Sequence, residues 1–402
     1  MVSERGSWAV LATVNGLGPQ TFGLLLTEHG TGRRVLELAG SVAGRRLIRD
    51  GPRRDRDRLP TPMVEALGLA AADGGAVLTR LADRGIGYLT VDDEVYPARL
   101  RELAEPPFVL FIRGDPASLS APRSVAIVGT RRPTEPGRRI AARIADTVTR
   151  LGAVVVSGLA LGIDGAAHAA AVSVSRPTVA VLGSGHDRLY PRAHVRLADE
   201  IVASGGALIS ESPPDAGPSR GTFPRRNRVI SGLADATVVV EAAPGSGALI
   251  TARWALEQGR DCFLVPGSID APKSVGCLEF LREYAGLARI VAGVADLIDD
   301  LGLVPPDTTS PGRAGTASRD AVLAVLGDVE AIVAGALIDG VTTADELAER
   351  TRLSVATILG TLTLLEMRGV VASAMGRYRP AGVLAGVPPG FALPRDPVLP
   401  SR

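Results

Sequence analysis

Short apolar runs rich in valine and isoleucine alternate with helical stretches between about Ser124 and Leu301. Strands that are buried on both faces of a parallel sheet have such near-continuous β-branched runs. The alternation therefore predicts an α/β domain with a Rossmann-like, doubly wound, mostly parallel sheet, whose ligands bind at the carboxyl ends of the strands. We expect the strands at Ser124–Val128, Ala153–Val156, Thr178–Leu182, Ala207–Ser210, Thr237–Val240 and Cys262–Val265, and a buried strand within Pro107–Ile112 that leads into this domain.

The sequence on either side of this alternation has a different character. Before it, Gly16-Leu-Gly18 separates two short helical stretches and resembles the turn of a helix-hairpin-helix or SAM-like domain, although a plain tight turn between packed helices is favoured. Pro305 to Ser318 is rich in proline, glycine and serine, which is typical of a linker. We predict a helical N-terminal domain at 1–85, the Rossmann-like domain at 86–302, a linker at 303–318, a winged-helix domain at 319–382 with helices at Asp320–Leu326, Thr343–Arg350 and Val355–Arg368, and a flexible tail at 383–402.

The overall charge, the cysteine content and the lengths of the apolar runs argue against several classes of protein. The 402-residue chain has a formal net charge of only +1, so a general attraction to nucleic acid is not predicted and any anion site must be a local patch. Cys262 and Cys277 are too few for a disulfide framework and lack metal-site spacing. There is no signal-like segment and no apolar run of roughly 18 residues. The sequence predicts a cytoplasmic protein with no metal, no cofactor and no contact with a membrane.

Glycine-rich turns follow four of the expected strands. Because the carboxyl ends of parallel strands meet at one edge of the sheet, these turns should lie together. Glycine lets the backbone approach a ligand closely, and the free amides at helix starts bind anions. The four turns therefore predict an anion site, and they are Gly129-Thr-Arg-Arg132, Ser157 to Gly165, Gly183-Ser-Gly185 and Pro244-Gly-Ser-Gly247.

A cluster of arginines lies in the segment Phe223-Pro-Arg-Arg-Asn-Arg-Val-Ile-Ser-Gly232. Guanidinium groups are planar, permanently charged donors that suit phosphate oxygens. No turn matches the dinucleotide pattern GxGxxG or the triphosphate pattern GxxxxGK[ST]. The segment thus predicts a phosphate site that is not built for a dinucleotide or for ATP hydrolysis.

Two further polar residues near these turns allow two interpretations each. His168 could touch a ligand, or it could be a helical histidine that is satisfied locally, which is the favoured alternative. Glu241, at a strand end, could be catalytic or could form an ion pair with a nearby arginine.

The motifs, taken in order, resemble the family of DNA-processing protein A, also called DprA or Smf. Their order and spacing are kept, and Tyr96-Pro and Pro107 upstream are similar too. The layout of a helical N-terminus, a Rossmann-like centre and a winged helix also fits this family. The matching segments are Val125–Arg131, Ser157–His168, Phe223–Gly232, Val240–Thr251 and Gly259–Gly267.

The resemblance implies a single-stranded DNA-binding protein that is not an enzyme. Members of the family protect incoming strands during natural transformation, form homodimers and load the RecA recombinase. Arg226 fills the variable position of the motif and is a weaker candidate for the site. The positions that match the family's DNA-binding pocket are Gly129, Thr130, Arg131, Ser157, Gly158, Gly162, Arg225, Asn227, Arg228, Ser246 and Gly247.

Two parts of the chain depart from what this resemblance implies. Leu278-Glu-Phe-Leu281 stands where the family carries an asparagine and a leucine-isoleucine pair. The expected recognition helix of the winged helix, Ser354–Leu362, has no arginine or lysine. A helix that enters a major groove normally brings such side chains, so we expect weak or no duplex binding from it, and contact with protein or regulation instead. Arg377 and Arg379 on the hairpin are the only candidates for phosphate contacts in this domain.

An enzyme of the related Rossmann-like group, a nucleotide phosphoribohydrolase, is the alternative. Such enzymes resemble this chain in placing a glycine-rich loop after a strand, with the pattern Pro-Gly-Gly-x-Gly-Thr-x-x-Glu. Here the corresponding segment, Pro244 to Ala252, has no glutamate. A third interpretation, a winged-helix transcription regulator, is weakened by the uncharged recognition helix.

Overall fold

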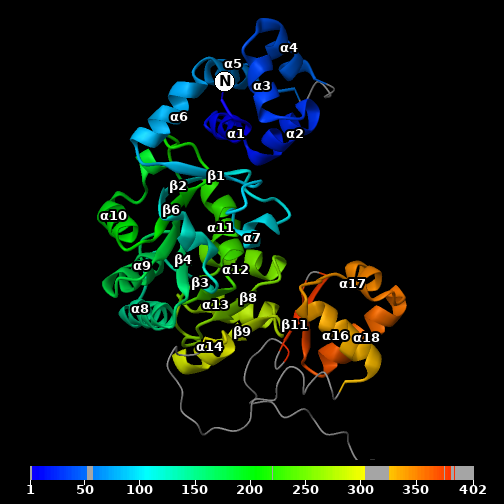
Figure 1. Cartoon of the computed structure of the whole chain (residues 1–402). Coiled ribbons are helices and arrows are strands. Elements are labelled where there is room, and N and C mark those ends of the chain that lie inside the picture. The colour runs from blue at the N-terminus through cyan, green and yellow to red at the C-terminus, as the bar shows by residue number, and fades with distance from the viewer. Residues whose placement is uncertain are drawn as a thin grey trace, which may run out of the picture.

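The computed structural model describes residues 2–51, 58–219, 221–303, 326–374, 376–381 and 384. Figure 1 shows a group of helices at one end, a sheet flanked by helices in the centre, and a small helical unit with a hairpin beside it. The predicted linker, apart from Leu303, and the predicted tail, apart from Leu384, lie outside the described residues.

The N-terminal region is helical, as predicted. Side chains of Ser3, Thr31 and Ser41 accept hydrogen bonds from the first turns of three of its helices, which fixes where they begin. Its apolar core continues into the sheet, because Val109 and Phe111 of the second strand belong to the same cluster. The helices are α1 (Glu4–Ala12), α2 (Pro19–His29), α3 (Gly32–Ala39), α4 (Val42–Asp50), α5 (Thr61–Ala72) and α6 (Gly74–Asp83).

The centre is a nine-stranded sheet with the order β1-β2-β6-β5-β4-β3-β7-β8-β9. The pairs β1–β2 and β2–β6 are antiparallel and the remaining pairs are parallel, so the predicted mostly parallel, doubly wound sheet is confirmed. The strands are β1 (Gly87–Thr90), β2 (Val109–Gly114), β3 (Ser124–Val128), β4 (Val154–Ser157), β5 (Thr178–Val181), β6 (Ala207–Ser210), β7 (Ala236–Val239), β8 (Asp261–Leu264) and β9 (Ala288–Ile290).

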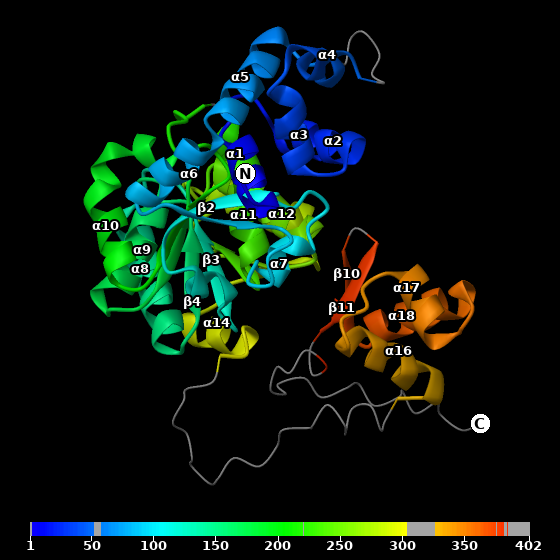
Figure 2. The ribbon, with the colours of Figure 1, turned by 45° about the horizontal axis from the view of Figure 1, so that its top comes forward.

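Helices cover both faces of this sheet (Figure 2). Successive side chains of β3 point to opposite faces: Ile127 packs in one cluster with Ile144, and Val128 packs in the other with Val229 and Leu249. The helices of this central region are α7 (Ala98–Arg101), α8 (Glu135–Arg150), α9 (Ile163–Ser173), α10 (Val195–Ala203), α11 (Thr222–Leu233), α12 (Gly247–Glu257), α13 (Val275–Glu283) and α14 (Val294–Asp300). Short 3₁₀ turns lie at Pro116–Ser120, His186–Arg188 and Arg192–His194.

The winding direction reverses between β3 and β7. The chain runs from β3 outward through β4, β5 and β6, then returns through α11 to place β7 on the other side of β3. In an open α/β sheet the crevice at such a reversal, beyond the carboxyl ends of the strands, is where ligands bind.

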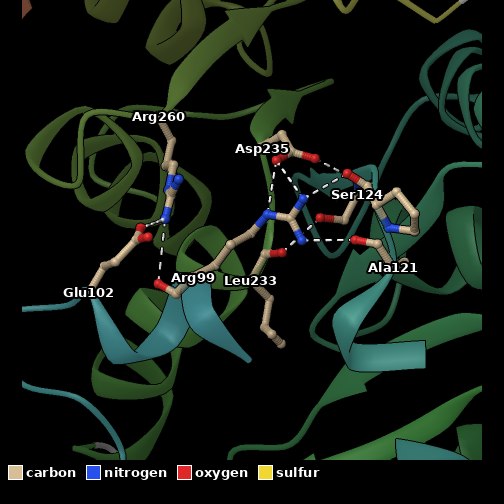
Figure 3. Close-up of polar contacts among 8 residues, drawn as sticks. Arg99, Glu102, Ala121, Ser124, Leu233, Asp235 and Arg260 are labelled. Atoms are coloured by element: carbon tan, nitrogen blue, oxygen red, sulfur yellow. Dashed lines mark hydrogen bonds and ion pairs between the residues drawn. The ribbon is translucent and has the colours of Figure 1, made fainter. Parts of the chain in front are cut away.

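A polar network at the opposite ends of the same two strands fixes the connection after β1 (Figure 3). Arg99 donates from Nε to Asp235 Oδ1 at 2.9 Å and from Nη1 to the Ala121 carbonyl at 2.9 Å. The second Asp235 oxygen accepts from the Ser124 amide at 2.8 Å. One carboxylate therefore joins α7, the start of β3 and the turn before β7.

The C-terminal unit contains α16 (Asp328–Ile338), α17 (Ala344–Thr351), α18 (Val355–Met367) and the hairpin strands β10 (Val371–Ala374) and β11 (Arg377–Pro380). This arrangement confirms the winged helix, and its first described helix was not predicted from the sequence. It begins at Asp328, after Gly327, whose amide donates to Glu330 Oε2. Nearly all of the predicted helix at 320–326 falls outside the described residues.

Across the described ranges, no helix is long and apolar enough to cross a membrane.

Candidate nucleic-acid interface

A cavity of ≈ 690 Å³ opens where β3 and β7 end. We call it the switch-point cavity. Its wall includes the turn after β3, the start of α12 and one side of α11. Of the predicted site residues, Gly129, Thr130, Arg131, Asn227, Ser246 and Gly247 line it. The structure thus brings together residues from three separate motifs.

The turns after β3 and β4 pack so closely against each other that a side chain is excluded at one glycine in each. A Cβ on Gly129 would lie 2.6 Å from Cγ1 of Ile163, and a Cβ on Gly162 would lie 2.3 Å from the Thr130 carbonyl oxygen. Gly162 also has a φ of +87°, which side chains disfavour. Gly162 therefore does not line the cavity but lets the two turns pack against each other.

Hydrogen-bond donors are available at the start of α12. Ser246 is the N-cap residue, and the amides of Gly247 and Ala248 are among those that an α-helix leaves without an internal acceptor. The Ser246 hydroxyl is buried and has no hydrogen-bond partner among the described residues. A helix start with such donors favours an anion through both its amides and its dipole.

Arg131 is the exposed cation of the cavity. Its guanidinium carbon lies 5.6 Å from the ring centre of Phe223, which lines the same cavity. A cation on one side of an aromatic ring, with free amides near by, can hold a phosphate and a base of the same nucleotide.

The arginine cluster is split by the helix that contains it. Successive residues of an α-helix are rotated by about 100°, so positions 225 to 228 of α11 face four directions. Asn227 donates from Nδ2 to the Gly247 carbonyl at 3.0 Å and faces the cavity. Arg225 is exposed and faces the helical region, where a Cβ on Gly18 would lie 3.4 Å from its Nη1.

Arg226, the weaker candidate of the arginine cluster, lines the switch-point cavity. It is 7% exposed, and its Nη1 donates to the carbonyl oxygens of Gly158, at 2.8 Å, and Val181. Burial lowers the pKa of Arg226 to about 10, against the opposing effect of Asp164, so the group is charged at neutral pH. Helical periodicity could have revealed it, since Arg226, Val229, Ile230 and Leu233 share the buried face of α11.

Arg228 lies apart from this cavity. Its Nη2 is 2.7 Å from Glu211 Oε1 and its side chain is 4% exposed.

Ser157 and Gly158 do not line the cavity, and both are held by hydrogen bonds to neighbouring residues. The Ser157 hydroxyl donates to the Ile127 carbonyl at 2.6 Å, and the Gly158 amide donates to Asp164 Oδ2 at 3.1 Å.

The two ambiguous residues have structural roles in this arrangement. His168 is buried, with Nδ1 2.8 Å from Thr178 Oγ1, as the favoured interpretation predicts. Burial lowers the pKa of His168 to about 3, and the charges of His194 and Arg226 act in the same direction. The Glu241 carboxylate accepts from the Thr134 amide at 2.9 Å and from its hydroxyl, so it is held at the start of α8.

The segment that departs from the family pattern is part of the core. Leu278 to Leu281 lies in α13, where Phe280 is 1% exposed and Leu281 packs against the main apolar cluster.

In the part of the chain that the structure describes, no group of three or more His, Cys, Asp or Glu residues is placed to hold a metal ion.

Sequence and structure comparisons identify relatives of this chain. The family model for DNA recombination-mediator protein A matches residues 87–302, and that for the DprA winged helix domain matches residues 306–377. A putative DNA processing protein DprA from Mycobacterium tuberculosis is 38% identical over 354 residues, which are 85% of each chain. Protein Smf from Escherichia coli is 38% identical over 296 residues, 72% of this chain and 76% of that one.

A solved structure has the same fold over most of its length. The X-ray structure of DNA processing protein A from Streptococcus pneumoniae aligns with a TM-score of 0.57 and 32% identity, and it covers 74% of this chain and 98% of that one.

Proposed function

Because this chain belongs to the DNA recombination-mediator protein A family, also called DprA or Smf, we propose that it binds single-stranded DNA in the switch-point cavity and delivers the strand to a RecA recombinase. The role of the family is DNA processing and recombination mediation. Protection of incoming strands in natural transformation is the cellular setting that we propose for it.

The observation that supports this proposal best is the pairing of Arg131 with Phe223 opposite the start of α12. A phosphate placed between Arg131 and the amides of Gly247 and Ala248 receives donors from two sides. An unpaired base beside it can stack on Phe223, which a base inside a duplex cannot do. Such contacts bind a phosphate and the face of a base, so binding depends little on the base sequence of the strand.

The expected residues take different parts in the proposed site. Gly129, Thr130, Arg131, Asn227, Ser246 and Gly247 line the cavity and contact the strand. Arg225 contacts the strand further along, on the side of the helical region. Ser157, Gly158, Gly162 and Arg228 position the surrounding backbone. Arg226 joins the site as a buried charge behind Phe223.

We further propose that the protein is not an enzyme, that it forms a homodimer, and that it acts in the cytoplasm. The start of α12 offers no carboxylate of the kind that a phosphoribohydrolase needs, because Pro244 to Ala252 contains no glutamate or aspartate. Glu241, the acidic residue nearest in sequence, is held by Thr134. Release of free base from nucleoside monophosphates by the purified protein would overturn this assignment.

We also propose the domain bounds given by the sequence: 1–85, 86–302 and 319–382. They are supported by the ends of α6 at Asp83 and of α14 at Asp300, between which the sheet and its helices are complete.

The proposal is tested by fluorescence anisotropy with a labelled single-stranded oligonucleotide over a range of salt concentrations. Arg131→Ala should weaken binding and lower the log–log salt slope by about 0.7, the value for one lost phosphate contact on a single strand. Arg139→Ala is the matched control, because that arginine is 66% exposed and lies on α8 outside the cavity. Equal affinities and slopes for wild type and Arg131→Ala would contradict the proposal.

A further inference from the structure

Tyr190 stands between the switch-point cavity and a second cavity of ≈ 930 Å³, and it lines both. Tyr190 is 47% exposed. Among the residues that the structure describes, no other aromatic side chain is found with the exposed large apolar residues. Aromatic residues form only 3% of the chain, and most large aromatic rings are buried away from water. The exposed ring of Tyr190 is therefore a candidate contact surface for a ligand.

The ring of Tyr190 extends the aromatic surface that Phe223 begins. The two ring centres are 5.9 Å apart and the planes are inclined by 66°, which is a favourable edge-to-face contact. Phe223 in turn lies 5.6 Å from the Arg131 guanidinium. The Arg131 cation, the partly buried ring of Phe223 and the exposed ring of Tyr190 thus follow one another out of the switch-point cavity.

The second cavity offers positive charge on the far side of Tyr190. Arg188 and Arg192 line it, are exposed, and form no ion pair among the described residues. Two other charged residues of the lining have ion-pair partners: Asp187 pairs with Arg84, and Arg113 pairs with Asp199, each at 2.6 Å. Asp215 is the remaining carboxylate of the lining, so two arginines face one acid.

We propose that Tyr190 is a stacking platform for a nucleobase, and that the strand leaves the switch-point cavity over this ring, with its phosphates beside Arg188 and Arg192. This inference rests on the proposed function, because it extends the same bound strand by at least one nucleotide. It adds three residues that no sequence motif indicated. Stacking on a tyrosine face is indifferent to which base is present, so the platform suits a protein that binds any sequence.

The test compares two oligonucleotides of equal length, a dT oligomer and an abasic oligomer with the same sugar-phosphate backbone, on the full-length protein. Tyr190→Ala should weaken binding of the dT oligomer by about 5- to 150-fold, as expected for one lost stacked base. It should leave binding of the abasic oligomer unchanged. Tyr190→Phe keeps the ring and should bind both oligomers as the wild type does.

Arg188→Ala combined with Arg192→Ala should weaken binding of both oligomers, because phosphates are present in each. Arg196→Ala is the matched control, since this arginine is 92% exposed, pairs with Glu200 and does not line the cavity.

The possible outcomes separate the inference from the function on which it rests. If Tyr190→Ala weakens both oligomers equally, or neither, Tyr190 is not a base platform and the inference fails. If Arg131→Ala weakens dT binding in the same experiment, the switch-point site survives that failure. If the wild type does not bind the dT oligomer, the proposed function fails and the inference fails with it.

Discussion

Arg228 and Glu211 form a two-point ion pair, with Nη2 2.7 Å from Oε1 and Nη1 3.0 Å from Oε2. The arginine is almost fully buried and the glutamate is partly exposed, with 4% and 18% of their side chains accessible. The pair joins α11 to the segment that follows β6. Arg225, three positions earlier, is exposed and forms no ion pair among the described residues. The two arginines of one motif therefore lie in different surroundings.

We expect Arg228→Ala to lower the free energy of unfolding by about 3–5 kcal/mol, because it leaves the Glu211 carboxylate without its partner in a largely buried place. Arg225→Ala should change it by less than about 0.5 kcal/mol, since the side chain is exposed. Urea denaturation followed by circular dichroism measures both. Equal stability of the two variants would show that the ion pair does not support the fold.

His168 should make the protein sensitive to acid. Its pKa of about 3 in the folded state lies below the ordinary value near 6.5, so above pH 6.5 it is neutral in both states and has no effect. As the pH falls from 6.5 towards 3, the unfolded state binds a proton that the folded state does not. The free energy of unfolding then falls by about 1.4 kcal/mol per pH unit.

This prediction is measured as the difference between urea unfolding at pH 7 and pH 5. The wild type should lose roughly 2 kcal/mol more than His168→Gln over this interval. Burial also lowers the pKa of His186, but that histidine is present in both proteins and cancels in the comparison. An identical loss in both would mean that His168 takes up a proton in the folded state as readily as in the unfolded one.

The sequence predicted the sheet because its central strands are continuous apolar runs, which leave few other folds open. It missed β1 and β9, whose segments Gly87–Thr90 and Ala288–Ile290 are short and partly polar or exposed. Both lie at the edges of the sheet, where one side of the strand has no neighbour and the apolar pattern weakens.

The sequence predicted at which edge of the sheet the candidate site lies, but not which side chains line it. Strand-end glycines located the edge of the sheet. The sequence could not show which arginine of the cluster lines the switch-point cavity, because the partners that decide it are distant in the sequence: Glu211 for Arg228, and the Gly158 carbonyl for Arg226. Tyr190 was missed since a single aromatic residue in a turn has no periodicity and no motif.

The network around Asp235 gives a prediction for stability far from the cavity (Figure 3). Asp235→Ala removes the acceptor for Arg99 Nε and for the Ser124 amide. Leaving these donors unpaired should cost about 1–3 kcal/mol of unfolding free energy each. Thermal unfolding should show a lower midpoint, while affinity for single-stranded DNA at a temperature below the transition stays that of the wild type. Asp146→Ala is the control, because its ion pair with Arg150 is on the surface of α8.

The winged helix should add little to duplex binding. Val355–Met367, which is α18, contains no arginine or lysine, and Arg379 is engaged with Asp261 of the sheet domain at 2.6 Å. Arg377 is exposed and is left as the phosphate contact that the hairpin could offer. Anisotropy with a labelled duplex should give the same log–log salt slope for wild type and Arg377→Ala, whereas a lost phosphate contact on B-DNA would lower it by about 0.9. A drop of that size would place duplex DNA on the hairpin, and the role of the domain would then be DNA contact instead of contact with protein.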